Sequence, residues 1–161
     1  MVRLKNSVLL GFALELGSIL ADAPENDQTL LRELGINLGI GFQLKDDLLD
    51  VYADSSKFGK QIGGDIISNK KTYLLIKALE LSKGEEKKRL NFWLKKKEFD
   101  SEEKVREVVR IYNKLDIKAL TEKKMNEYFD KGLKILDSLA VSEEKKEPLK
   151  QLTLQLIDRE M

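Results

Sequence analysis

The stretch Phe42-Gln43-Leu44-Lys45-Asp46-Asp47-Leu48-Leu49-Asp50 decides how this chain of 161 residues is interpreted. In a helix, positions i, i+3, i+4 and i+7 share one face, and this spacing is found at Gln43, Asp46, Asp47 and Asp50. Apolar residues flank the polar stripe on both sides. Adjacent carboxylates repel one another unless a cation offsets their charge. Oxygen ligands suit a hard ion, and magnesium typically takes one or two carboxylates together with phosphate oxygens and waters.

A segment rich in glycine and lysine follows the acidic stripe. The loop expected over residues 54–68 contains Gly59-Lys60 and Gly64-Asp65-Ile66, and Asn69-Lys70-Lys71-Thr72 comes next. Glycine lets backbone amides turn toward an anion, and lysines add positive charge. The stripe and the loop together indicate a site for magnesium and a diphosphate. Each alone also fits a simpler interpretation: a solvated helix face for the stripe, and a basic surface loop for the segment, which lacks the P-loop order.

Composition excludes several other kinds of site. The chain has no cysteine and no histidine, so disulfides, zinc–thiolate sites, Ser-His-Asp triads and histidine bases are impossible within it. A net charge of +1 gives no long-range attraction to nucleic acid. The apolar residues 7–23 are interrupted by Glu15 and are too short for a membrane span. We therefore expect a cytoplasmic protein with no nucleic-acid partner and no stable membrane insertion.

Hydrophobic periodicity predicts an all-α fold. No alternating run suggests a strand, and there are only two prolines. Helices are expected over residues 2–22, 25–53, 69–82, 85–97, 101–115, 117–139 and 146–159. Ser68 or Asn69 is the expected cap of the third helix, and Pro148 is expected near the start of the last.

Two features of the first two helices predict close packing. The helix over residues 2–22 is apolar nearly all round, so it should be buried or lie in an interface. The next helix contains Gly35, Gly39 and Gly41, each costly in a helix interior. They predict a close approach of helices, or room for a substrate beside the backbone.

These motifs resemble the second aspartate-rich region of the trans-isoprenyl diphosphate synthases. This polyprenyl synthetase family includes the farnesyl and geranylgeranyl diphosphate synthases. Met1–Leu20 resembles the helix that carries the family's Lys-Thr pair, with Asn6 in place of the threonine, and Leu149–Arg159 resembles its C-terminal helix. The resemblance implies a partial isoprenoid-synthase-type helical bundle. Residues 1–161 would be the C-terminal part of one all-α domain, without the N-terminal half that carries the first aspartate-rich motif.

The resemblance also implies a reaction and a role for each motif residue. The family is magnesium-dependent and condenses isopentenyl diphosphate with an allylic diphosphate. Magnesium would be bound by Asp46 and Asp50, with Asp47 supporting them through water or a lysine. The substrate diphosphate and the pocket around it would be contacted by Lys5, Asn6, Lys60, Lys70, Phe42 and Gln43. The residues expected to carry catalysis are Gln43, Asp46, Lys5 and Lys60.

The missing motif shapes the expected activity. Asp46-Asp47 is the only adjacent aspartate pair in the chain, so the chain would hold half of the magnesium–diphosphate site and be inactive or weakly active alone. The alternative is a non-catalytic regulatory or binding subunit of a prenyl synthase. A homodimer is expected from the family, and self-association is expected if the apolar face of the first helix is bare.

Overall fold

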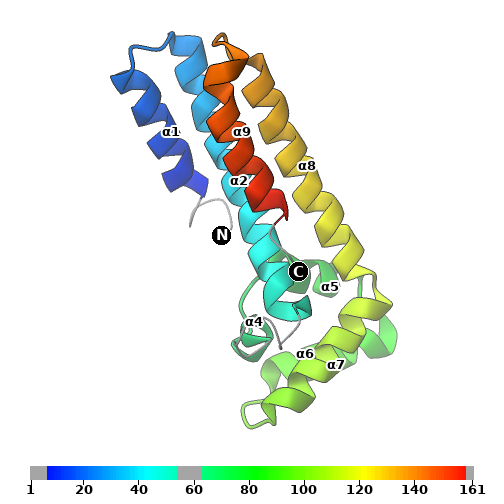
Figure 1. The fold of residues 1–161 in the computed structure, drawn as a ribbon. Helices are drawn as coiled ribbons and strands as arrows, with labels where there is room; N and C mark the ends of the chain where they lie inside the picture. The colour runs from blue at the N-terminus through cyan, green and yellow to red at the C-terminus, as the bar shows by residue number, and fades with distance from the viewer. Residues whose placement is uncertain (1–6, 54–62, 159–161) are drawn as a thin grey trace. The chain divides into compact units, whose positions relative to one another are not determined.

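The computed structural model describes residues 7–53 and 63–158. The described residues form α1 (Val8–Leu20), α2 (Glu25–Tyr52), α4 (Gly64–Ile67), α5 (Tyr73–Leu81), α6 (Gly84–Lys95), α7 (Ser101–Lys114), α8 (Ile117–Ser138) and α9 (Glu143–Asp158) (Figure 1). No strand occurs in these two ranges. The all-α prediction is therefore confirmed. Within the same ranges, no helix combines the length and apolar character needed to cross a membrane.

The chain divides into two compact units, which are described separately. The first combines residues 1–45 with residues 123–160, and the second is formed mainly by residues 46–122. The helices α2 and α8 each run from one unit into the other.

In the first unit, the N-terminal part of α2 packs closely against α1. A Cβ atom added at Gly35 would lie 2.7 Å from the Gly11 Cα and N atoms of α1, and one added at Gly39 would lie 2.5 Å from the Ser7 Cα atom. Gly41 faces α8 instead, where an added Cβ would lie 2.9 Å from the ring of Phe129. Real Cβ atoms do not approach other atoms this closely. The glycines of α2 therefore serve close helix packing, as the sequence predicts.

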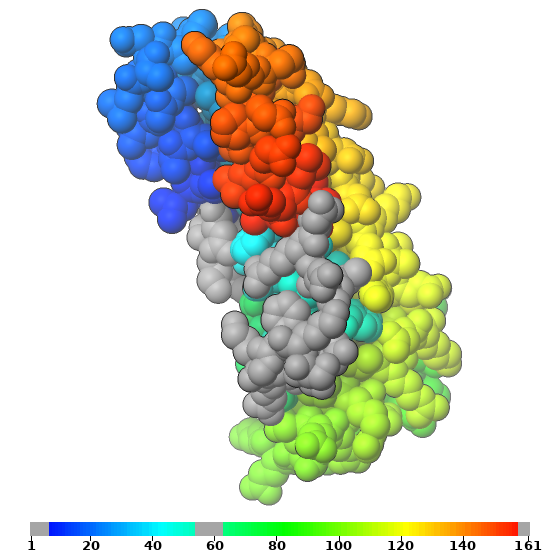
Figure 2. Space-filling view, viewed as in Figure 1, coloured from blue at the N-terminus to red at the C-terminus, as the bar shows by residue number. Residues whose placement is uncertain are grey.

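The outer face of α1 is apolar and exposed. Leu9 is 69% exposed, Phe12 55% and Leu20 78%. In the space-filling view, α1 (blue) forms part of the surface of its unit (Figure 2). The buried residues of α1 are the small ones, Gly11 and Ser18. The helix therefore turns its small residues inward and its large apolar residues outward, and among the described residues nothing covers the outward face.

In the second unit, α7 packs against α4, α5 and α6. It begins after Asp100, whose side chain accepts a hydrogen bond from the Glu103 N–H at 2.8 Å. Its inward face buries Val108, Ile111 and Tyr112. The α7 helix thus supports α4, α5 and α6 within this unit.

Three local predictions were wrong. The loop expected over residues 54–68 contains the short helix α4, held by Ile66, which is buried. The cap of α5 is Thr72, whose hydroxyl accepts the Leu75 N–H at 3.2 Å, so neither expected residue caps it. The last helix begins at Glu143 rather than at 146. Its first turn is fastened by the buried Lys146, which donates to the Asp137 carbonyl at 2.8 Å.

Candidate functional site

The three aspartates of the acidic stripe lie at the C-terminal end of α2 but differ in burial. Asp46 is exposed and Asp50 is half-buried. Asp47 is only 2% exposed. A stripe turned to bulk water would expose all three carboxylates, so the solvated-face interpretation fails for Asp47. Burying a carboxylate is costly unless it is paired and hydrogen-bonded, and the pairing explains its position.

Lys70 provides that pairing. Its ammonium group lies 3.2 Å from Asp47 Oδ1 and 2.6 Å from Asp65 Oδ2. Burial alone would lower the pKa of Lys70, but the hydrogen bonds and charges of Asp65 and Asp47 outweigh it and raise the pKa. The lysine is therefore held in its charged form between a carboxylate of α2 and a carboxylate of α4.

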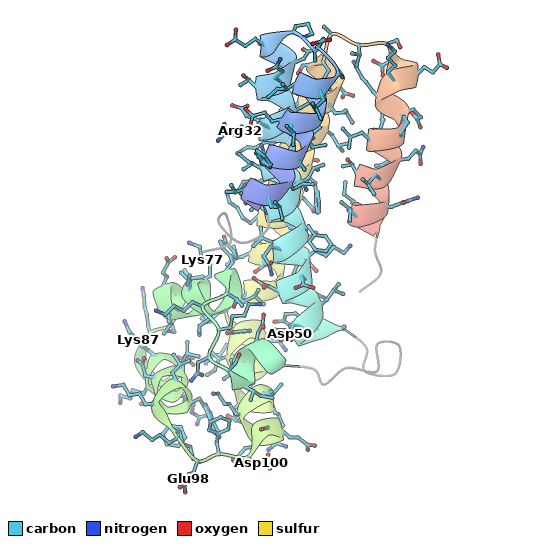
Figure 3. The ribbon with its side chains drawn as sticks, turned by 90° about the vertical axis from the view of Figure 1, so that its left-hand side faces the viewer. Arg32, Asp50, Lys77, Lys87, Glu98 and Asp100 are labelled. Carbon is cyan, nitrogen blue, oxygen red and sulfur yellow. The ribbon has the colours of Figure 1, made fainter. Side chains whose placement is uncertain are left out.

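Asp50 joins the same cluster through the backbone. Its Oδ2 atom accepts a hydrogen bond from the Asp65 N–H at 2.9 Å, which ties the end of α2 to the start of α4. Figure 3 shows Asp50 at this place beside α4. Burial raises the pKa of the Asp50 carboxyl, and the nearby charges of Asp65 and Asp46 raise it further, while the hydrogen bond and Lys70 lower it. Extra positive charge near Asp50 would therefore be favourable.

The donor set at this end of α2 fits magnesium. Four carboxylates, those of Asp46, Asp47, Asp50 and Asp65, belong to this region, and among the described residues Lys70 forms ion pairs with two of them, Asp47 and Asp65. Their excess negative charge favours a cation, and all the donors are oxygen. Within the described ranges no three acidic side chains already converge as a ready-made metal site. Magnesium usually needs only one or two carboxylates, because phosphate oxygens and waters complete its shell.

The sequence of the chain matches a known protein family. The sequence profile described as Polyprenyl synthetase matches residues 1–112. The chain belongs to the polyprenyl synthetase family. It is 46% identical over 79 residues to the farnesyl diphosphate synthase of Bacillus subtilis (strain 168), a match that covers 49% of this chain and 27% of that protein. The resemblance seen in the sequence is therefore confirmed.

Solved structures of the family extend the likeness to almost the whole chain. A geranylgeranyl pyrophosphate synthase is 37% identical with a TM-score of 0.88, and the match covers 99% of this chain and 50% of that one. A second, from Corynebacterium glutamicum and complexed with isoprenyl diphosphate and magnesium, is 26% identical with a TM-score of 0.85. That match covers 98% of this chain and 45% of that one. The chain thus spans about half the length of these synthases and has their fold over that half.

The other residues predicted for the site are only partly within the described ranges. Lys5, Asn6 and Lys60 lie outside the described residues. Gln43 and Phe42 belong to the first unit, where Gln43 is 5% exposed and Phe42 is half-buried. The structure brings Lys70 together with the aspartates, and the roles of all these residues in binding stay predictions.

Sequence reasoning assigned no role to two residues of this cluster. Asp65 had a signal, because Gly64-Asp65-Ile66 was already part of the motif region. Lys104 had none, because it follows Glu102 and Glu103 at the start of α7 and nothing in this local sequence indicates that it is buried. Lys104 is instead 0% exposed.

Proposed function

We propose that this chain carries half of the magnesium–diphosphate site of a trans-prenyltransferase that joins isopentenyl diphosphate to an allylic diphosphate. One observation carries the proposal: at the end of α2, Asp47 is paired internally with Lys70, while Asp46 stays exposed beside it. Such an arrangement leaves an exposed carboxylate at a fixed place in a cluster of excess negative charge. Family membership and the named substrates of the related synthases support the substrate class.

Each residue of the site has a separate role in this proposal. Asp46 and Asp50 would hold the magnesium ion, which when bound supplies positive charge toward the departing diphosphate. Asp47 would orient this end of α2 through Lys70 rather than bind the ion directly. The Lys70 ammonium adds a fixed positive charge at the same place, and Lys60 is predicted to do the same from the preceding loop. Gln43 and Phe42 are predicted to line the pocket that excludes water from the reacting carbons.

The chain spans about half the length of the solved synthases it matches, and its single aspartate pair is one side of the site. We therefore expect little or no turnover from this chain alone. The exposed apolar face of α1 supports association with a second helical partner, including the homodimer expected for the family. A cytoplasmic location completes the proposal.

The test is titration calorimetry of this chain with inorganic pyrophosphate, with and without magnesium. We expect binding only with magnesium, and we expect Asp46→Asn to weaken it at least tenfold. Asp130→Asn, an exposed aspartate of α8 in the first unit, is the matched control and should bind as the unchanged chain does. Binding that ignores magnesium, or an Asp46→Asn variant as tight as the control, would contradict the proposal.

The alternative is a non-catalytic subunit that binds or regulates a prenyl synthase, and it is favoured by the same exposed α1 face. Supplying the N-terminal half of a related synthase as a separate chain separates the two. Prenyl transfer that appears in the mixture and is lost with Asp46→Asn supports the catalytic role. Complex formation with an intact synthase, without any contribution of Asp46 to turnover, supports the subunit role.

A further inference from the structure

Lys104 is a buried lysine of α7 that makes no ion pair with a carboxylate among the described residues. Its ammonium group donates to the Ile67 carbonyl at 3.1 Å and to Asn69 Oδ1 at 2.7 Å. It also lies 4.1 Å from the centre of the Phe99 ring. All three partners are neutral, and burial lowers the pKa of this lysine. A buried charge held only by neutral groups is costly to keep, so its position calls for an explanation.

The acceptors of Lys104 lie at the end of α4, in the case of Ile67, and on the turn that joins α4 to α5, in the case of Asn69. Asn69 has a φ of 53°, a left-handed conformation that asparagine tolerates better than most residues. Its side-chain amide is fixed at both ends, because it accepts from Lys104 and donates to the Leu94 carbonyl at 3.3 Å. The conformation of the turn is therefore set from α7 and α6, and Lys104 supplies the charged hydrogen bond.

The residue after this turn is Lys70. Its backbone N–H donates to the Asp65 carbonyl at 2.9 Å, and its own carbonyl accepts the Thr72 N–H at 2.8 Å. With the backbone held on both sides, the direction of the Lys70 side chain toward Asp47 and Asp65 is fixed. A change in the turn at Asn69 would move the start of that side chain.

We propose that Lys104 is a positioning residue: by fixing the turn at Asn69, it holds the Lys70 ammonium between Asp47 and Asp65. The consequence for diphosphate binding rests on the proposed function. The positioning itself is a property of the chain without any ligand, so it is tested separately. The competing explanation is that Lys104 only adds to the stability of α7.

The first experiment compares Lys104→Met with Ile111→Ala. Methionine keeps an apolar stem that ends at the Cε position and removes the ammonium group with its charge and both hydrogen bonds. Ile111 is buried on the same helix and takes no part in the contacts above, so its truncation destabilises α7 without changing the turn. The readout is the proton–nitrogen NMR signal of the Lys70 ammonium, assigned by its loss in Lys70→Arg.

We expect the Lys70 signal to be protected from exchange in the unchanged chain and in Ile111→Ala, and to be lost or shifted to that of a free lysine in Lys104→Met. Asn69→Gly is the second variant, because glycine keeps the left-handed backbone while removing the amide. It should loosen Lys70 in the same direction and keeps the test decisive if Lys104→Met does not fold. An unchanged Lys70 signal in Lys104→Met would overturn the proposal. If only Asn69→Gly folds, an unchanged Lys70 signal in that variant would overturn it. Equal loss in Ile111→Ala would also overturn it.

The ligand experiment uses inorganic pyrophosphate with magnesium, at a temperature where every variant is folded. We expect Lys104→Met to bind at least tenfold more weakly than Ile111→Ala, with Lys104→Arg recovering part of the difference. If the unchanged chain binds no pyrophosphate, the proposed function fails while the NMR comparison still decides the positioning. If Lys104→Met frees Lys70 but binds pyrophosphate as tightly as Ile111→Ala, the claimed consequence for binding is wrong.

Discussion

Replacing Lys70 by methionine is the most direct test of the charge cluster. The change removes an ammonium group that lies 2.6 Å from Asp65 and 3.2 Å from Asp47. The Asp47 side chain is 1% exposed and that of Asp65 is 18% exposed, while the Lys70 side chain is 28% exposed. The pair is therefore neither a surface ion pair nor a fully buried one, and the change takes the Lys70 ammonium away from the buried Asp47 carboxylate.

The burial of each partner sets the expected magnitude. Removing one partner of a fully buried pair costs about 3–5 kcal/mol, and losing an exposed pair costs about 0–1 kcal/mol. Because water can reach part of the Lys70 side chain, we expect Lys70→Met to lower the free energy of unfolding by about 2–3 kcal/mol. For a small protein this corresponds to a fall of about 1 M in the urea midpoint.

The assay is urea unfolding followed by far-ultraviolet circular dichroism at pH 7. Lys88→Met is the matched control, because Lys88 pairs with Glu85 at 2.9 Å with side chains that are 76% and 71% exposed. This control should change the free energy of unfolding by less than about 0.5 kcal/mol. Equal losses in the two variants would refute the reasoning, since they would mean that Asp47 does not depend on Lys70.

Three further predictions concern other parts of the chain. Gly35→Ala should destabilise the protein by about 2 kcal/mol, because the new Cβ would lie 2.7 Å from the α1 backbone. Gly17→Ala should stabilise it by up to about 1 kcal/mol, because nothing lies within 4 Å of the new Cβ. Urea midpoints that move in the same direction in the two variants would contradict this prediction. Burial raises the pKa of Tyr52 to about 12 and also raises the pKa of Tyr112. Because the hydroxyls of these tyrosines lose their protons at lower pH in the unfolded state than in the folded state, the free energy of unfolding should fall as pH rises above about 10. Absorbance at 295 nm of each Tyr→Phe variant identifies which tyrosine titrates late. The exposed α1 face should cause concentration-dependent self-association, which Leu9→Lys should reduce in sedimentation measurements; a monomer at all concentrations would argue against an interface there.

The acidic stripe was predictable because helix geometry depends only on sequence spacing. The different roles of the aspartates within the stripe were not predictable from the spacing. Asp46 and Asp47 are neighbours of the same type, and the spacing places both on one polar face. Which one is buried depends on where Lys70 and α4 pack against α2, and residues 15 or more positions away in the sequence determine that. Sequence spacing predicts the polar face of the helix, and tertiary contacts determine which aspartate is buried and which is exposed.

Charged residues show the same limit. Lys88 and Lys104 both lie in runs of lysine and glutamate near the start of a helix, and both read as solvated. Lys88 is exposed, whereas Lys104 is buried beneath the turn at Asn69. No local pattern separates them, because the difference comes from the neutral oxygens of Ile67 at the end of α4 and of Asn69 on the following turn, which accept from Lys104. Cap prediction failed at Thr72 for a related reason, since Ser68, Asn69 and Thr72 all have side chains suited to capping and only the folded turn selects one.

An adjacent aspartate pair can serve structure and binding at once only if its members face different neighbours. A single aspartate could not do both, because pairing with a lysine offsets the charge that would attract a cation. Two adjacent residues on a helix are about 100° apart around its axis, so one can point into the protein while the other reaches solvent. Asp47 has the first position and Asp46 the second. We therefore propose that the pair is required as a pair: Asp47 anchors the end of α2 through Lys70, and Asp46 is thereby held rigidly where a cation can reach it.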